Sequence, residues 1–328
     1  MQPRLSSSAY IEGILAGNRV ILSRAITLIE SNLLQDKELS YQVLEAILPH
    51  TGKSVRVGIT GVPGVGKSTF IEAFGQHITS LHKKLAVLAI DPSSQLTKGS
   101  ILGDKTRMEE LARNPLAYIR PSPTSGSLGG VAHKTRETML LCEAAGFEVI
   151  IVETVGVGQS ETLVKGMVDF FLLLMLSGAG DELQGIKKGI MEMADALAIT
   201  KADGDNAAKA TQAQAEYQNA LHLFPPLVTG WFPTVLTCSA LTKKGIVALW
   251  ELVEKHQTLM HKNGHFVQNR QTQQLAWMHS YIRQTLEDRF YQHPDIQQLL
   301  PQLTQAVQQG EMLPIRAASE LLRIFGEK

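Results

Sequence analysis

The chain has 328 residues, more than the roughly 100 to 200 of a typical domain, so we expect one large domain with helical additions or two domains. Apolar residues make up 44% and charged residues 19%, a composition that excludes disordered, collagenous and rod-like proteins. The 31 Lys and Arg balance the 31 Asp and Glu, and this zero net charge argues against nucleic acid as the main partner. The only cysteines, Cys142 and Cys238, lack the close spacing of a zinc site or a disulfide framework, which favours a reducing compartment.

Neither a membrane span nor a leader peptide is expected. The longest dense apolar run, residues 170–176, is the size of a strand rather than of a transmembrane helix. Residues 1–8 contain no apolar segment of the kind found in secretory signals. The sequence therefore predicts a cytoplasmic protein with no membrane partner.

The first 50 residues predict a helical lead-in. An apolar helical face is formed by Ile11, Ile14, Leu15, Leu22, Ala25, Ile26 and Ile29. Ser40 can cap a second helix that carries Val43, Leu44, Ile47 and Leu48. We assign residues 1–50 to this region.

Residues 51–255 predict an α/β domain with a mostly parallel sheet. Short apolar runs, each followed by a helical stretch, occur at 55–60, 85–90, 149–152, 170–176, 196–199 and 234–237. This rhythm is typical of βαβ units with helices on both faces of the sheet. Residues 256–328 return to helical periodicity, with an apolar stripe formed by Leu275, Met278, Ile282 and Leu286.

A phosphate-binding loop follows the first predicted strand. The sequence G-x-x-x-x-G-K-S lies between a strand and a helix, which is the context that this motif requires. Its backbone N–H groups can surround a phosphate, Lys67 can neutralise the β and γ charges, and Ser68 can bind Mg²⁺. The predicted phosphate-binding residues are Gly61, Val62, Pro63, Gly64, Val65, Gly66, Lys67, Ser68 and Thr69.

A second motif predicts guanine as the base. Thr200-Lys201-Ala202-Asp203 follows an apolar run and resembles the [NT]-K-x-D signature of GTPases. The Asp203 carboxylate can accept hydrogen bonds from the ring N–H and the 2-amino group of guanine, whereas adenine has no 2-amino group. The segment Ser239, Ala240 and Leu241 resembles the companion loop that offers a backbone N–H to the guanine carbonyl.

Acidic residues at strand ends are candidates for metal binding and hydrolysis. Asp91 follows the run 85–90, and Glu153 follows the run 149–152 and opens an E-x-x-G motif that ends at Gly156. Either carboxylate can hold Mg²⁺ or position the attacking water, and the Gly156 N–H can contact the γ-phosphate. Two polar, glycine-containing segments, 91–107 and 177–189, could close over the nucleotide.

Together these motifs resemble a specific family, the MeaB/ArgK-type GTPases, which includes the human methylmalonic aciduria type A protein. The matching segments are 58–69, 91–94, 99–108, 120–132, 153–161, 178–192 and 201–206. The resemblance implies a P-loop G domain flanked by N-terminal helices and a C-terminal helical dimerisation arm, and hence a homodimer. It also implies a GTPase that chaperones adenosylcobalamin-dependent methylmalonyl-CoA mutase by gating cofactor loading and protecting the enzyme.

The same resemblance implies roles for individual residues. It places Lys67 and Ser68 on the phosphates and Mg²⁺, and Asp91, Asp104 and Glu153 around the metal and the attacking water. The switch that responds to the partner would be 178–189, with Asp181, Gln184 and Lys187 as its working residues and Lys187 also catalytic. Thr200 stands where many relatives have Asn, which predicts weaker binding of the base.

Two other functions remain open from the sequence. A nickel-type metallochaperone would need ligands, and His256, His261 and His265 do not share one helical face, so solvated histidines are expected instead. A phosphotransferase or kinase would pass the γ-phosphate to a protein or small molecule, but the chain has no H-R-D or D-F-G motif of protein kinases.

Overall fold

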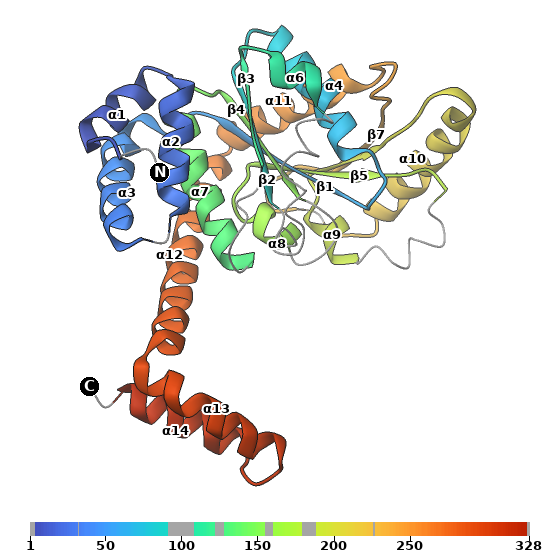
Figure 1. The fold of residues 1–328 in the computed structure, drawn as a ribbon. Coiled ribbons are helices and arrows are strands. Elements are labelled where there is room, and N and C mark those ends of the chain that lie inside the picture. Colours follow the sequence, from blue (N-terminus) through green and yellow to red (C-terminus); the bar gives the residue numbers. More distant parts are fainter. Residues whose placement is uncertain are drawn as a thin grey trace. The chain divides into compact units, whose positions relative to one another are not determined.

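The computed structural model describes residues 4–31, 33–90, 108–121, 128–154, 160–178, 188–225 and 227–326. Its central feature is a seven-stranded, wholly parallel sheet (Figure 1), which confirms the predicted α/β class. The strand order is β3-β2-β4-β1-β5-β6-β7. The strands are β1 (Val55–Gly61), β2 (Leu85–Ile90), β3 (Ala117–Arg120), β4 (Val149–Thr154), β5 (Phe170–Met175), β6 (Ala196–Ile199) and β7 (Thr234–Thr237).

Helices cover both faces of this sheet. One face packs against α7 (Leu128–Ala144), α8 (Ser160–Lys165), α9 (Lys188–Met193) and α10 (Ala207–Leu221). The other face packs against α4 (Lys67–Ser80), α6 (Glu109–Arg113) and α11 (Ile246–Lys262). Strands β2, β4 and β5 are buried along their whole length, because helices exclude water from both of their faces.

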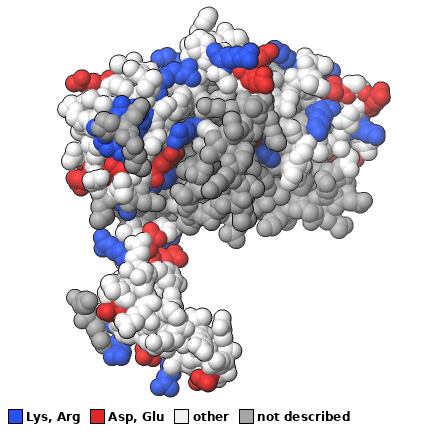
Figure 2. Space-filling view, in the orientation of Figure 1, with Lys and Arg blue, Asp and Glu red and all other residues white. Residues whose placement is uncertain are grey.

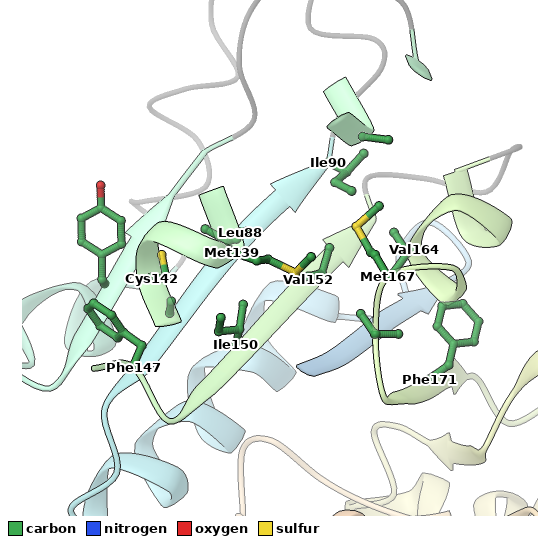
Figure 3. Packing of buried hydrophobic residues seen from close by; sticks show 14 of the residues in the cluster. Leu88, Ile90, Met139, Cys142, Phe147, Ile150, Val152, Val164, Met167 and Phe171 are labelled. Carbon is green, nitrogen blue, oxygen red and sulfur yellow. The ribbon is translucent and has the colours of Figure 1, made fainter. Parts of the chain in front are cut away.

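Figure 3 shows the core on the α7 and α8 face. Side chains from β2 and β4, including Leu88, Ile90, Ile150 and Val152, meet Met139 of α7 there. Cys142 is completely buried in this cluster. The burial of these side chains holds the carboxyl ends of β2 and β4 in fixed positions.

The N-terminal helices form a further layer on α7. They are α1 (Ser7–Leu15), α2 (Arg19–Glu30) and α3 (Leu34–Ile47), followed by a 3₁₀ turn, η1 (Leu48–His50). The first helical face predicted from sequence is divided between α1 and α2, because Gly17 adopts a positive φ of 70° and Asn18 caps α2 with its side chain. The prediction that Ser40 caps a helix is wrong, since α3 begins at residue 34 and the Ser40 hydroxyl donates to the Lys37 carbonyl.

One strand, β3, was absent from the sequence prediction. It has only four residues and lies at the edge of the sheet, where it pairs with β2 alone. Its short Ala-Tyr-Ile-Arg sequence gives neither a long apolar run nor a clear alternation.

The chain divides into two compact units, residues 1–273 and 274–328. The boundary predicted after residue 255 falls inside α11. The long helix α12 (His265–Gln292) begins in the first unit, and α13 (Pro294–Gln308) and α14 (Pro314–Gly326) pack against each other in the second around Ile296, Leu303, Ala317 and Leu321. No helix among the described residues is long and apolar enough to cross a bilayer.

Buried charges fix the start of β1 within the first unit. Glu143 of α7 accepts hydrogen bonds from the Gly52 N–H, the Ser54 hydroxyl and the Arg56 guanidinium. Arg270 of α12 binds Asp169 through two nitrogen atoms, and the Asp169 carboxylate also accepts the Arg56 N–H. Burial raises the pKa of Glu143, but Arg56 and the other donors outweigh burial and hold the pKa below its usual 4.5.

We predict that Glu143→Gln lowers the free energy of unfolding by about 3 kcal/mol at neutral pH, because it leaves the Arg56 charge without its carboxylate. Since folding depresses the pKa of Glu143, its stabilising contribution is complete above pH 4.5 and is lost as the pH falls through the folded-state pKa. Urea unfolding followed by tryptophan fluorescence checks this. The difference between the two proteins should shrink under acidic conditions, and a difference that grows there would contradict the assignment.

Candidate nucleotide site

The phosphate loop lies at the carboxyl end of β1, the central strand of the sheet. Strands β4 and β5 flank β1, so the loop is held at the point where open parallel sheets bind ligands. Gly66 directly precedes α4 and has a φ of 89°. This backbone conformation favours glycine. At Gly61 a Cβ atom would lie 2.6 Å from the Leu174 carbonyl oxygen, so only glycine allows β1 to approach β5 this closely.

Lys67 is half-buried at the first position of α4. Its Nζ donates to the carbonyl oxygens of Gly61 at 2.8 Å and of Val62 at 3.4 Å. Burial lowers the pKa of Lys67, while the charges of Glu153 and Glu161 act in the opposite direction. The ammonium group therefore lies in a pocket with two carboxylates close enough to affect its ionisation.

Of the acidic residues predicted around the metal, the described structure places Glu153. It lies inside β4 rather than after it, is 4% exposed, and stands in register with Ile59 of β1. Beside it, the Thr154 hydroxyl donates to the Thr60 hydroxyl at 2.7 Å and joins the ends of β4 and β1. Asp91, Asp104, Gly156, Asp181, Gln184 and Lys187 lie outside the described residues.

A cavity of about 240 Å³ lies beside the phosphate loop and contains most of the predicted base-binding residues. Its lining is Val65, Gly66, Thr69, Phe70, Thr200, Lys201, Asp203, Cys238, Ala240 and Leu241. Two loops, at residues 200–203 and 238–241, thus lie beside the phosphate loop, although they follow it by more than 130 residues in sequence. Its size suits a single flat ring system.

The two base loops are held to each other by specific bonds. The Ser239 hydroxyl bonds to the Asp203 carboxylate, and the Ala202 N–H donates to the Cys238 carbonyl at 3.0 Å. The second Asp203 oxygen, Oδ1, is not part of the Ser239 bond. A carboxylate fixed in this way can accept two parallel hydrogen bonds from guanine. Ser239 itself is completely buried and orients Asp203 rather than lining the cavity.

Thr200 has a role that the sequence did not reveal. Its buried hydroxyl lies 2.8 Å from the Val65 carbonyl of the phosphate loop and 3.2 Å from the Met175 carbonyl at the end of β5. Lys201 makes a second connection, with its Nζ 2.8 Å from the Gly64 carbonyl. Thr200 therefore joins the base loop to the phosphate loop.

Two further residues near the site were also missed. Phe70 is absent from the predicted site residues but lines the cavity from α4. Glu161, at the start of α8, is 1% exposed and acts on the pKa of Lys67. Nothing in the sequence around Glu161, which follows a glycine-containing segment, indicated that this side chain would be buried near Lys67.

His256, His261 and His265 differ in their surroundings. His256 is 5% exposed and lies between Phe170 and Trp231, so the expectation of a solvated side chain is wrong for this residue. Burial lowers the pKa of His256 despite the nearby Asp195. Across the described ranges, no group of three His, Cys, Asp or Glu side chains is placed to hold a metal ion.

We predict that Thr200→Val weakens binding of GDP by about tenfold, because the valine leaves a buried carbonyl of the phosphate loop without its donor. Thr200→Ser retains the hydroxyl and serves as the matched control, with an affinity near that of the wild type. Titration with a fluorescent guanine nucleotide measures both. Equal affinities for the valine variant and the wild type would show that the two loops are held together by other contacts.

Comparison with known proteins is consistent with this geometry. Residues 22–295 match the family model described as methylmalonyl Co-A mutase-associated GTPase MeaB. A putative GTPase of Caulobacter vibrioides is 51% identical over 99% of this chain and 100% of its own length. The GTPase ArgK of Escherichia coli is 47% identical over 94% of each chain.

A mitochondrial relative and a solved structure are also similar to this chain. A mitochondrial methylmalonic aciduria type A homolog of Mus musculus is 46% identical over 95% of this chain and 78% of its own. A solved structure described as a LAO/AO transport system kinase has a TM-score of 0.78 and 38% identity, with 99% of both chains covered. The family model and these relatives cover the phosphate loop, the base loops and the whole parallel sheet. The chain therefore belongs to the MeaB family of P-loop GTPases, enzymes that hydrolyse GTP.

Proposed function

We propose that the chain is a Mg²⁺-dependent GTPase that chaperones adenosylcobalamin-dependent methylmalonyl-CoA mutase, gating cofactor loading and protecting the mutase from inactivation. The observation that carries the nucleotide half of this proposal is the cavity in which Asp203 and Lys201 meet the phosphate loop at Gly66. The mutase half is supported by the description of the family and by the names of the mitochondrial relatives.

In this proposal Asp203 selects the base. Its carboxylate accepts the ring N–H and the 2-amino group of guanine, and the Ser239 hydroxyl holds it in position. Adenine presents an acceptor in place of the ring N–H, so ATP would leave the carboxylate unsatisfied in a partly buried site.

Lys67 and the phosphate loop would hold the triphosphate. The ammonium group can exchange its bonds to the Gly61 and Val62 carbonyls for bonds to phosphate oxygens. Water then attacks the γ-phosphorus, the bond to the bridging oxygen of the β-phosphate breaks, and GDP and phosphate result. The buried Glu153 carboxylate, close to Lys67, is our candidate for positioning that water.

We infer a magnesium site from the chemistry of the oxygen donors near the phosphate loop. Ser68 in the first turn of α4 and Glu153 on the adjoining strand provide hydroxyl and carboxylate oxygens, the ligand atoms that Mg²⁺ prefers. We propose that they hold Mg²⁺ together with Asp91 and Asp104, and that the ion neutralises charge on the phosphates. Catalytic and switch roles for Asp181, Gln184 and Lys187 remain proposals that rest on the family resemblance.

We also propose a homodimer formed through the C-terminal helices. The predicted stripe on α12 is exposed, with Leu275, Met278, Ile282 and Leu286 between 46% and 59% accessible. Repeated apolar side chains on one side of a long exposed helix are typical of an interface between helices. The cytoplasm is the proposed location, since Cys142 and Cys238 are both free thiols.

We predict that Asp203→Asn reduces the preference for GTP over ATP by about 1 to 3 kcal/mol, the cost of an unsatisfied polar pairing. Competition binding of the two nucleotides to each protein measures the change. Lys67→Ala is the reference for loss of phosphate binding with the base site intact. If Asp203→Asn retains full guanine selectivity, the base site has been assigned to the wrong residue.

The partner is tested by phosphate release from GTP, alone and with a purified adenosylcobalamin-dependent acyl-CoA mutase. We expect slow turnover alone, stimulation by the mutase, and little release from ATP. The Lys67→Ala variant controls for contaminating phosphatases. Turnover that the mutase leaves unchanged would remove support for the chaperone role while leaving the GTPase intact, and transfer of the γ-phosphate to an acceptor would favour a kinase instead.

A further inference from the structure

A second cavity, of about 630 Å³, lies between the N-terminal helices and the edge strand β3. Its lining is Arg4, Arg19, Val20, Ser23, Arg24, Thr27, Tyr118 and Arg120. It shares no residue with the cavity beside the phosphate loop. Half of its lining residues are arginines, and none of the described lining residues is acidic. Figure 2 shows Lys and Arg side chains over the N-terminal helices, with Asp and Glu side chains among them.

Two of these arginines are fixed by carboxylates that do not line the cavity. Arg4 binds Asp36 of α3 through two bonds, of 3.0 Å and 2.6 Å. Arg120, at the end of β3, binds both oxygens of Glu30 at the end of α2. Paired geometry of this kind holds a guanidinium rigidly, and here it does so at the wall of a cavity.

Arg19 contributes charge that no carboxylate among the described residues balances. Its guanidinium donates to the carbonyl oxygens of Ala117 at 2.5 Å and Pro115 at 3.5 Å, and lies 5.8 Å from the centre of the Tyr118 ring. These partners orient the group but carry no formal charge. Arg24, five residues further along α2, places a fourth guanidinium at the same cavity.

Neutral hydroxyl groups complete the wall. Tyr118 and Ser23 share a hydrogen bond of 3.0 Å, in which one hydroxyl donates and the other accepts, so the accepting hydroxyl keeps a hydrogen that it can donate to a ligand. Burial raises the pKa of Tyr118, which keeps the phenol protonated at neutral pH. Thr27 is exposed on the same side of α2, and its hydroxyl donates to the Ser23 carbonyl.

We propose that this cavity binds a small molecule bearing phosphate. Guanidinium groups match the geometry of phosphate oxygens and bind them bidentately, whereas metal cations and organic cations would be repelled. The volume lies in the range of small-molecule sites and exceeds that of one inorganic phosphate, so a phosphorylated organic molecule fits better. The site is independent of the proposed mutase and of GTP hydrolysis.

The test is calorimetric titration of the full-length protein, saturated with GDP and Mg²⁺ so that the phosphate loop is occupied. The probes are inorganic phosphate, inorganic pyrophosphate and glucose 6-phosphate, with sulfate as the control anion. We expect saturable binding of one equivalent of a phosphate probe, weakened by added salt. Stronger binding of the sugar phosphate than of inorganic phosphate identifies the organic class, and the reverse order identifies the free anion as the ligand.

Thr27→Glu and Thr27→Gln form the matched pair of variants. The glutamate adds a negative charge among the four guanidiniums and should weaken binding at least about tenfold, whereas the glutamine should bind within about twofold of the wild type. Arg113→Gln, which removes an exposed arginine outside the cavity, controls for net charge. Thermal unfolding confirms that each variant is folded.

Three results would overturn the proposal. They are the absence of saturable binding of every phosphate probe, equal binding of sulfate, and equal loss in Thr27→Glu and Arg113→Gln. Arg24→Gln gives a second reading if Thr27→Glu does not fold, and it should also weaken the phosphate probes.

Discussion

The hydrogen bond between the Thr200 hydroxyl and the Val65 carbonyl joins the two halves of the nucleotide site, which lie 135 residues apart in sequence. Its geometry depends on β5, which lies between β1 and β6 and accepts the Thr200 N–H at the Met175 carbonyl. The order of three parallel strands therefore sets the distance from phosphate loop to base loop. A threonine is sufficient at this position, because the strand order brings its hydroxyl within 3 Å of the Val65 carbonyl oxygen.

The interior of the site is governed by charge. Lys67 is half-buried, and burial of an ammonium group is unfavourable unless negative charge lies near it. Glu153 comes from β4 and Glu161 from α8, so two different elements supply that charge. The zero net charge of the whole chain is compatible with this arrangement, since acids and bases are distributed locally to match one another. A nucleotide would bring further negative charge, which the proposed Mg²⁺ would offset.

The sequence predicted the parts of the fold in which local pattern and final environment agree. The phosphate loop is recognisable because glycines at 61 and 66 satisfy steric needs that are also part of the motif. Long buried strands such as β5 are uninterrupted apolar runs for the same reason. Most residues that line the candidate base cavity belong to segments that the sequence assigned to the nucleotide, whereas Phe70 and Cys238 do not, and the bonds of Thr200 depend on contacts made across the sheet.

Two predictions failed for different physical reasons. The environment of His256 is set by distant elements, because Trp231 and Phe170, from other parts of the chain, enclose a residue that looks like part of an exposed helix surface. The failure at Ser40 is local, since the preceding turn of helix has few apolar residues and its sequence does not mark the true start of α3. Ser40 therefore lies inside the helix, where its hydroxyl donates to the Lys37 carbonyl.

The edge position of β3 and the cationic cavity are physically linked. A strand at the edge of a sheet has backbone groups without a neighbouring strand, and they require other partners. On β3 the Arg19 side chain supplies donors to the Ala117 carbonyl, so the edge is satisfied by α2 rather than by a further strand. A side chain that satisfies carbonyl groups brings a positive charge that those carbonyls do not neutralise. This contact at the edge strand therefore places a guanidinium that no carboxylate of the described residues pairs with beside Arg4, Arg24 and Arg120, and makes the cavity suited to an anion.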